Sequence, residues 1–276
     1  VLGSRGLGDV YKRQESSQVD LISATIAFSV AKRVVLVGDE KQLPHVVKSQ
    51  LLTTLNNIFA EYKLPEYFDY AKNSVLHCVL KKDQHIVSTL LNEHYRCDPQ
   101  IIGFCNKRFY NGELVIRTPH IEGNGVTIVS HGSHFERNRS NEREVDIIEK
   151  EIIKELPSDK TGIIAPYNNQ IALLNERFGD RGYVIDTIHK FQGKEKDYVL
   201  FTPTLDAIEP KWAIKFIGDK YNMLNVAVTR AKKQFIYVGN VDVAERSENY
   251  IAKLIKYIKA NGLVYSLYDI ENSVLN

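Results

Sequence analysis

Short, continuous apolar runs recur along this sequence of 276 residues, and stretches with helical apolar spacing separate them. The clearest runs cover residues 33–38, 161–165, 198–202 and 235–239. Runs of this length without polar alternation are typical of strands buried in a parallel sheet. The order of strands and helices therefore predicts a parallel or mostly parallel α/β sheet flanked by helices.

Cap residues mark the starts of two expected helices. Asp98 is suited to an N-cap and Pro99 to the first helical position, and Asn141 followed by Glu144 has the spacing of a second cap. We expect further strands at residues 125–130 and 183–186, and helices at residues 19–28, 168 onward, 221–232 and 248–261.

Composition sets broad limits on function. A hydrophobic fraction of 43% and a charged fraction of 25% are ordinary for a soluble globular protein. The three cysteines have no CxxC spacing, which favours a reducing, cytoplasmic setting over a zinc or disulfide framework. No apolar run is long enough for a membrane span. The net charge of +2 neither requires nor excludes nucleic acid.

The segment of residues 185–197 is unusually polar for a connection between two strands. It carries Thr187, His189, Gln192, Gly193 and Glu195 directly before the apolar run of residues 198–202. Such a density of hydrogen-bonding groups indicates a loop that binds phosphates or couples two ligands. The ordinary alternative for the histidine is a structural role.

Two further clusters flank predicted sheet elements. Gln42 follows the run of residues 33–38, and its amide could sense a phosphate or an attacking water; the alternative is a solvated turn. Arg96 could clamp a phosphoryl group and Tyr95 could stack on a base. The alternative is that Arg96 pairs with Glu93 or Asp98 at the start of the helix.

Two more polar positions suggest ligand contacts. Tyr167 and Asn168 follow the run of residues 161–165 and could contact a nucleic-acid backbone, although Asn168 could simply cap a helix. Arg230 lies within the otherwise apolar helix expected at residues 221–232. A guanidinium there requires an anionic partner, either a phosphate or a nearby acid.

Taken in order, these clusters resemble the C-terminal part of superfamily 1 helicases, in the branch of the nonsense-mediated-decay and Okazaki-fragment helicases. Gly38-Asp39-x-x-Gln42-Leu43-Pro44 resembles motif III, Tyr95-Arg96-x-x-Pro99 motif IV, Phe191-Gln192-Gly193-Lys-Glu195 motif V, and Leu224-Asn-Val-Ala-Val-Thr-Arg230 motif VI. Ala165-Pro166-Tyr167-x-x-Gln170 resembles a block between motifs IV and V. The resemblance covers about residues 15–262.

The resemblance implies a P-loop NTPase motor of two RecA-like domains, with ATP and Mg²⁺ between them and single-stranded DNA or RNA across them. Residues 15–82 would be a remnant of the first domain and residues 83–276 a complete second domain. The implied catalytic residues are Glu15, Gln42, Arg96 and Arg230. The implied nucleotide-binding residues are Tyr95, Gln192, Gly193 and Glu195, and the implied nucleic-acid-binding residues are Tyr167, Asn168, Thr187 and His189.

The sequence departs from the family pattern at its beginning. Residues 1–14 are interpreted as a non-native scar and set aside from the fold prediction. Gly3 and Gly8 have the outer spacing of a P-loop, but Asp9 stands where its lysine is required. No other GxxxxGK[S/T] occurs, and Gln14 replaces the magnesium-binding aspartate of motif II. We therefore expect an N-terminally truncated chain that binds neither ATP nor Mg²⁺ well and is inactive alone.

Two other functions are compatible with parts of the pattern. The first is a non-hydrolysing nucleic-acid-binding module. The second is a nuclease, since Asp39 and Lys41 imitate a metal site with Asp20, but the motif III context already accounts for these residues. His131 and His134 lie in a polar loop without a partner cysteine, so the sequence predicts no metal site of its own.

Overall fold

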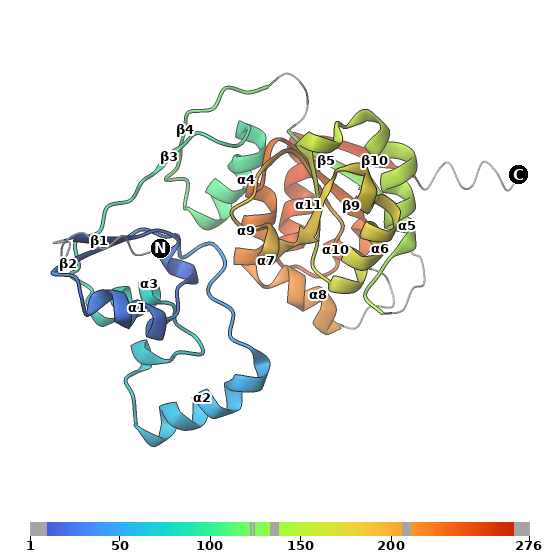
Figure 1. Cartoon of the computed structure of the whole chain (residues 1–276). Coiled ribbons are helices and arrows are strands. Elements are labelled where there is room, and N and C mark those ends of the chain that lie inside the picture. Colours follow the sequence, from blue (N-terminus) through green and yellow to red (C-terminus); the bar gives the residue numbers. More distant parts are fainter. Residues whose placement is uncertain (1–9, 122, 124, 133–137, 206–210, 268–276) are drawn as a thin grey trace, which may run out of the picture. The chain divides into compact units, whose positions relative to one another are not determined.

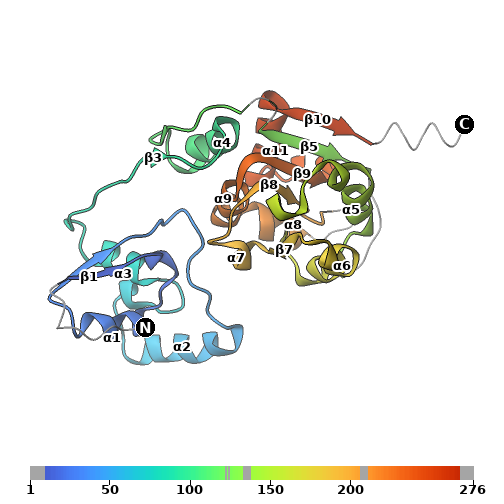
Figure 2. The ribbon, with the colours of Figure 1, turned by 45° about the horizontal axis from the view of Figure 1, so that its top comes forward.

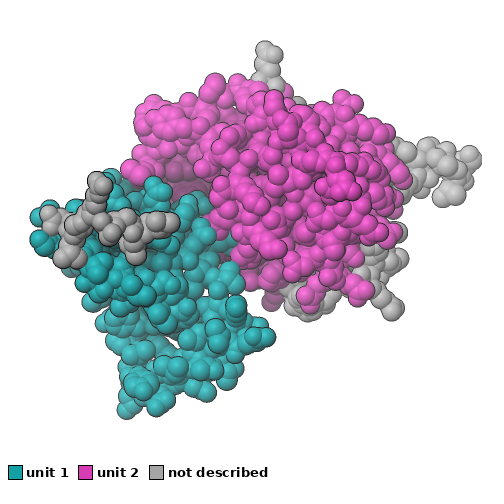
Figure 3. Space-filling view, viewed as in Figure 1, with its two compact units in different colours: residues 1–90 teal, residues 91–276 magenta. Residues whose placement is uncertain are grey.

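The computed structural model describes residues 10–121, 123, 125–132, 138–205 and 211–267. It forms two compact units, Val1–Leu90 and Leu91–Asn276, which we call unit 1 and unit 2 (Figure 3). The sequence placed the domain boundary after residue 82, where helix α3 (Val75–Lys82) ends, whereas the units divide after Leu90.

Unit 2 is built on a six-stranded sheet with the order β10-β5-β9-β8-β6-β7 (Figures 1 and 2). Its strands are β5 (Val126–Ser130), β6 (Thr161–Ala165), β7 (Val184–Thr187), β8 (Lys196–Phe201), β9 (Ala231–Gly239) and β10 (Leu263–Ser266). Every neighbouring pair is parallel. The predicted parallel α/β fold is therefore confirmed.

Helices cover both faces of this sheet. They are α4 (Pro99–Phe109), α5 (Glu142–Ile147), α6 (Asn168–Phe178), α7 (Ile188–Phe191), α8 (Lys211–Gly218), α9 (Tyr221–Thr229), α10 (Val241–Glu245) and α11 (Tyr250–Asn261). Helices α5 and α6 pack on one face, and α4, α9 and α11 lie on the other (Figures 1 and 2). Two layers of helices explain why β5 and β6 are buried along their whole length.

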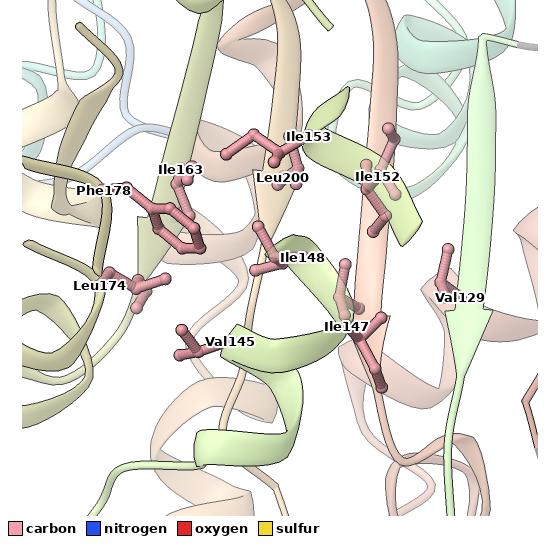
Figure 4. Packing of buried hydrophobic residues seen from close by; sticks show 13 residues of the cluster. Val129, Val145, Ile147, Ile148, Ile152, Ile153, Ile163, Leu174, Phe178 and Leu200 are labelled. Carbon is pink, nitrogen blue, oxygen red and sulfur yellow. The ribbon is translucent and has the colours of Figure 1, made fainter. Parts of the chain in front are cut away.

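The core on the α5–α6 face is dominated by branched aliphatic side chains (Figure 4). Ile148 lies among Ile163 and Leu200 of the sheet and Leu174 and Phe178 of α6, and all five side chains are fully buried. Burying each such side chain contributes about 1.5–3 kcal/mol to folding. The continuous apolar runs of the sequence therefore become the sheet's interior.

Several local signals form as expected. The Asp98 carboxylate accepts from the Gln100 N–H at 2.8 Å, and Pro99 is the first residue of α4. The Asn141 side chain caps α5 through the Glu144 N–H at 3.0 Å. Gly262 is the C-cap residue of α11, and a larger residue would not fit there because its Cβ would lie 2.0 Å from the Val126 carbonyl oxygen.

Other elements differ from the prediction. Helix α9 ends at Thr229, not at residue 232, because pairing with β8 extends β9 back to Ala231. Arg230 is consequently the C-cap residue between α9 and β9, not a residue of the helix interior. Helix α6 has Tyr167 at its N-cap position, so Asn168 is the first helical residue and not the cap.

Some elements were not anticipated. They are α8, α10, the edge strand β10, and the short parallel pair β3 (Glu93–His94) and β4 (Val115–Ile116). Strand β10 is exposed along its length, and it has only a short apolar stretch of three residues, Leu263 to Tyr265.

Unit 1 contains the parallel pair β1 (Val10–Arg13) and β2 (Arg33–Leu36), with α1 (Leu21–Phe28), α2 (Ser49–Glu61) and α3. Residues 10–13 thus form a strand, although they fall within the segment that was interpreted as a non-native scar. A small cluster of Val19, Ala24 and Val75 forms its core. Strand β2 is parallel as predicted but not buried: Val34 is 36% exposed and Val35 43%.

Among the described residues, no helix combines the length and apolar character needed to cross a membrane.

Candidate nucleotide and nucleic-acid sites

The expected nucleotide residues of unit 2 meet at the amino-terminal ends of β8 and β9. Glu195 directly precedes β8, and Arg230 directly precedes β9. Arg96 reaches the same edge because the Asp98 N–H donates to the Lys232 carbonyl oxygen at 2.7 Å. Backbone pairing thus brings three segments that are far apart in sequence to one edge of the sheet.

Glu195 bridges two cations at this edge. One carboxylate oxygen lies 2.7 Å from Arg96 Nε, and the other lies 2.6 Å from Lys232 Nζ. The Lys232 hydrogen bond, assisted by the charges of Arg96 and Arg230, outweighs partial desolvation and lowers the pKa of Glu195. The carboxylate therefore stays ionised at neutral pH.

Arg230 is buried, with 3% of the residue exposed. Its Nε donates to the Val226 carbonyl oxygen at 3.2 Å, and a terminal nitrogen donates to the Lys194 carbonyl oxygen at 3.3 Å. These oxygens hold the guanidinium beside Glu195, whose pKa it helps to lower. Its proposed contact with phosphate stays a prediction.

A pocket of about 500 Å³ opens at this edge. It is lined by Glu93, His94, Tyr95, Arg96, Glu195 and Lys232. Tyr95 is 68% exposed, and its hydroxyl donates to Glu93, which also binds Arg117 at 2.6 Å. Glu93 is therefore engaged by Tyr95 and Arg117, and the predicted alternative pairing of Arg96 with Glu93 or Asp98 is replaced by the pair with Glu195.

The pocket combines an aromatic face with fixed positive charge. Tyr95 offers a ring for stacking, and Arg96 and Lys232 offer cations for phosphate. Burial, together with repulsion from Arg96, lowers the pKa of His94 to about 4, so this ring is neutral at pH 7. Its Nε2 accepts from the Cys97 N–H at 2.9 Å, which fixes the chain next to Arg96.

Gln192 and Gly193 form a tight turn after α7. The Lys194 N–H donates to the Phe191 carbonyl oxygen at 3.0 Å, and Gly193 has a φ of 83°. This left-handed conformation favours glycine although a Cβ would meet no atom. Within the described part of the chain, the buried Gln192 Nε2 has no hydrogen-bond partner.

The expected nucleic-acid residues lie at the opposite, carboxyl-terminal edge of the sheet. Thr187 ends β7 opposite Ala165, the last residue of β6, and Asn168 follows as an exposed residue of α6. Tyr167 is only 7% exposed, and its ring stacks on Phe216 with centroids 5.8 Å apart. Tyr167 therefore has little free surface, while Asn168 is open to solvent.

His189 lies on α7, next to Thr187, and is exposed. Local desolvation of the ring, followed by repulsion from Lys220, lowers the pKa of His189. The ring is therefore neutral at pH 7 and is suited to hydrogen bonding or stacking rather than to ion pairing.

Residues 188–195 form the short crossover that links the two predicted sites. The connection leaves the carboxyl end of β7 and reaches the amino end of β8 two strands away in the sheet. Phe191 anchors it: a Cβ on Gly162 of β6 would lie 2.4 Å from the Phe191 ring. The polar segment that was predicted to bind phosphates or couple two ligands therefore runs from one predicted site to the other.

Sequence reasoning missed a buried polar network behind the carboxyl-terminal edge. The fully buried Glu144 accepts from the Thr202 hydroxyl and from the Thr204 N–H at 3.1 Å. Gln170 is also buried and donates from Nε2 to Thr202 Oγ1 at 2.9 Å. Glu144 was interpreted as part of a helix cap, and nothing in its spacing signalled burial. Thr204, with φ 56°, adopts a strained left-handed conformation that this network holds.

In unit 1, Glu15 and Gln42 follow the neighbouring strands β1 and β2. The Ser16 N–H donates to the Val37 carbonyl oxygen at 3.0 Å, which joins the two loops. Glu15 has a φ of 51°, and Gln42 Nε2 donates to Asp39 at 3.0 Å. Left-handed non-glycine residues cost about 1 kcal/mol and cluster at functional sites.

The described residues do not form a metal site by themselves. No group of three or more His, Cys, Asp or Glu side chains among them could hold an ion. Glu15 has Gln14 as its neighbour, so the carboxylate pair that would bind magnesium is incomplete. His131 is buried 3.8 Å from Glu144, and His134 lies outside the described residues.

Comparisons with known proteins agree on the class of this chain. A model of the AAA domain family matches residues 71–242. The DNA polymerase alpha-associated DNA helicase A of Saccharomyces cerevisiae is 27% identical over 83% of this chain and 36% of its own length. The probable RNA helicase armi of Drosophila melanogaster is 24% identical over 88% of this chain and 24% of its own length.

A solved complex of an arterivirus helicase with DNA has a TM-score of 0.44 and 14% identity, covering 92% of this chain and 43% of that chain. The chain spans about a third of the length of the yeast relative, at 36%. Because the family model covers more than half of the sequence, the chain belongs to the AAA domain family, and it is a superfamily 1 helicase-like domain.

Proposed function

We propose that this chain is the C-terminal motor portion of an ATP-dependent helicase that acts on DNA or RNA. Unit 2 supplies nucleotide contacts at the amino-terminal edge of its sheet, which bind a nucleotide only weakly without a P-loop, and it binds a single nucleic-acid strand at the carboxyl-terminal edge. The main support is the clustering of Arg96, Glu195 and Lys232 around one pocket, with Tyr95 in its wall.

The side chains present suit positioning and charge neutralisation, which dominate phosphoryl transfer. Arg96 and Arg230 neutralise phosphate charge, and Tyr95 stacks on the base. In unit 1, the Gln42 amide is suited to orienting a water molecule and the Glu15 carboxylate to accepting a proton. Magnesium would supply neutralisation of the β- and γ-phosphates, but no cluster of three or more potential ligands for it occurs among the residues that the structure describes.

We also propose that the 276 residues alone do not hydrolyse ATP. They contain no GxxxxGK[S/T] to cradle phosphates, and residue 14 is glutamine. Steady ATP hydrolysis stimulated by single-stranded nucleic acid, measured on the purified chain, would contradict this.

Binding experiments on matched variants test the two-edge arrangement. Arg96→Ala is expected to weaken the binding of a fluorescent ATP analogue about tenfold or more, because hydrogen bonds to charged groups are stronger than those between neutral groups. The double variant Asn168→Ala, His189→Ala is expected to weaken the binding of a labelled single-stranded oligonucleotide and to leave the binding of the ATP analogue unchanged. If both variants weaken the binding of both ligands equally, the proposal that nucleotide and strand bind at separate edges of the sheet is refuted.

A nucleic-acid-binding module without a motor is the second candidate, favoured by the absence of a P-loop from these residues. The oligonucleotide measurement distinguishes the two. In a motor, saturating ATP analogue changes the affinity for the strand, whereas a simple module binds equally with and without it. DNA and RNA of the same sequence should be compared side by side.

A further inference from the structure

We propose that Glu195 is an internal stand-in for phosphate: its carboxylate holds Arg96 and Lys232, and the phosphate chain of an incoming nucleotide competes with it for both cations. This inference rests on the proposed nucleotide site. It adds Lys232 as a second cation for the phosphate, and it makes Glu195 a competitor of the phosphate within the pocket.

The geometry uses both oxygens of the carboxylate. Arg96 Nε contacts one oxygen at 2.7 Å, and Lys232 Nζ contacts the other at 2.6 Å. A carboxylate oxygen on Nε occupies one of the two edges at which a guanidinium can hold a phosphate by two hydrogen bonds. A phosphate can therefore engage that edge only after Glu195 has moved.

The three side chains come from separate segments whose backbones are fixed. Asp98, two residues after Arg96, is hydrogen-bonded to the Lys232 carbonyl oxygen at 2.7 Å, and Lys232 itself lies in β9. Glu195 precedes β8, which pairs with β9. Side-chain rotation alone is therefore enough to exchange the carboxylate for a phosphate.

Solvent exposure makes the exchange feasible. The Arg96 side chain is 41% exposed, and those of Glu195 and Lys232 are each 38% exposed. Ion pairs at this exposure contribute little to stability, so a polyphosphate with several negative charges can displace one carboxylate. A structural ion pair would instead be buried and costly to break.

The other carboxylate of the pocket does not share this arrangement. Glu93 is engaged by Arg117 at 2.6 Å and by the Tyr95 hydroxyl, whereas Arg96 and Lys232 pair with Glu195. The stand-in role therefore belongs to Glu195.

Inorganic tripolyphosphate is the probe that isolates this competition, because it has no ribose or base. Glu195→Gln keeps the side-chain shape and removes the charge, so the variant is expected to bind tripolyphosphate about three- to tenfold more tightly than the native chain. Asp197→Asn is the matched control: it removes the same charge two residues away, where the partner is Lys233 at 2.8 Å.

The control separates local competition from general charge. Asp197→Asn is expected to change tripolyphosphate affinity less than twofold at physiological ionic strength, where distant exposed charges are largely screened. If both variants tighten binding equally, the effect is only net charge, and the stand-in role is overturned.

A measurement on the native chain protects the test against misfolding of the variant. In ¹⁵N NMR, the Arg96 Nε–H resonance is expected to shift on addition of tripolyphosphate. The resonances of the Lys233–Asp197 pair are expected to keep their chemical shifts. Glu195→Gln should move the same resonance without any ligand. A resonance that does not respond to either change overturns the proposal.

The outcomes also separate this inference from the proposed function. If the native chain binds an ATP analogue but Glu195→Gln gains no affinity for tripolyphosphate, the stand-in role fails and the nucleotide site stands. If neither protein binds either ligand at the pocket, both proposals fail.

Discussion

At the scale of single residues, the pairing of Glu195 with Arg96 and Lys232 is set by how the backbones of β8 and β9 meet. Motif spacing singled out Tyr95, Arg96, Glu195 and Arg230, and the structure brings the last three to one edge. Their pairing depends on the register of β8 and β9, which no local pattern encodes. Lys232 stood next to a motif without any assigned role for the same reason.

The pH dependence of His94 follows from its burial. Burial and Arg96 lower its pKa from 6.5 to about 4, so the unfolded chain binds a proton that the folded chain does not. The free energy of unfolding should therefore fall as pH drops from 6.5 to 4, by at most about 1.4 kcal/mol per pH unit. Urea denaturation across this range measures it.

His94→Gln is the comparison for that experiment. The variant keeps an acceptor near the Cys97 N–H but cannot titrate, so its stability should depend less on pH between 6.5 and 4. An identical slope in the native and variant proteins would show that His94 is not responsible.

Glu144 should act with the opposite sign. Burial raises its pKa above 4.5, so the folded chain retains a proton that the unfolded chain releases. Replacing it in Glu144→Gln removes this effect, and the native stability relative to the variant should decline as pH rises from 4.5 through the raised pKa. His131, 3.8 Å away, and Tyr237 are the neighbouring titratable groups.

Glu149→Gln provides a control of reversed sign for the same denaturation series. Arg177 and Arg181 lower the pKa of Glu149, so its contribution is present above pH 4.5 and is lost as pH falls. Parallel pH profiles for the two variants would contradict the assignment of Glu144 as a desolvated acid.

At the scale of elements, burial decided what could be predicted. Strands β5 and β6 are covered on both faces, so their sequences are unbroken apolar runs. Strand β10 is an exposed edge, and its three apolar residues, Leu263 to Tyr265, are too few to stand out as a buried run. The end of α9 was misplaced because Ala231 suits a helix locally but pairs with Lys196 in the sheet. Tertiary pairing overrode local propensity there.

The connection of residues 188–195 can be tested through its anchor. In Gly162→Ala, the new Cβ would lie 2.4 Å from the Phe191 ring, so α7 must shift. Overpacking of this kind costs about 1–3 kcal/mol in the free energy of unfolding. Because α7 carries His189, the affinity for a single-stranded oligonucleotide should fall as well.

Gly179→Ala is the matched control, since its Cβ would find its nearest neighbours at 3.8 Å and the backbone is helical. It should leave both stability and strand binding nearly unchanged. Adding Phe191→Leu to Gly162→Ala should recover part of the lost stability. If Gly162→Ala behaves like Gly179→Ala, the Phe191 ring does not anchor the connection.

At the scale of the whole molecule, the two units differ in how much they bury. Unit 2 has a continuous core across both faces of a six-stranded sheet. Unit 1 has a two-stranded sheet and a small cluster, and Val34, Val35 and Val37 are each at least 36% exposed.

We expect unit 1 to unfold at lower urea concentration than unit 2. Far-UV circular dichroism reports both units, whereas the single tryptophan, Trp212, belongs to α8 of unit 2, so its fluorescence serves as the probe of that unit. The dichroism transition should begin before the fluorescence transition, because a small apolar core opposes chain entropy weakly. Limited proteolysis should likewise cleave within residues 10–90 first and leave a resistant fragment of unit 2. Coincident transitions, or early loss of unit 2 with unit 1 intact, would contradict this order.

Replacing Val35 with threonine should reduce binding of an apolar dye without moving the fluorescence midpoint, because the exposed valine belongs to unit 1.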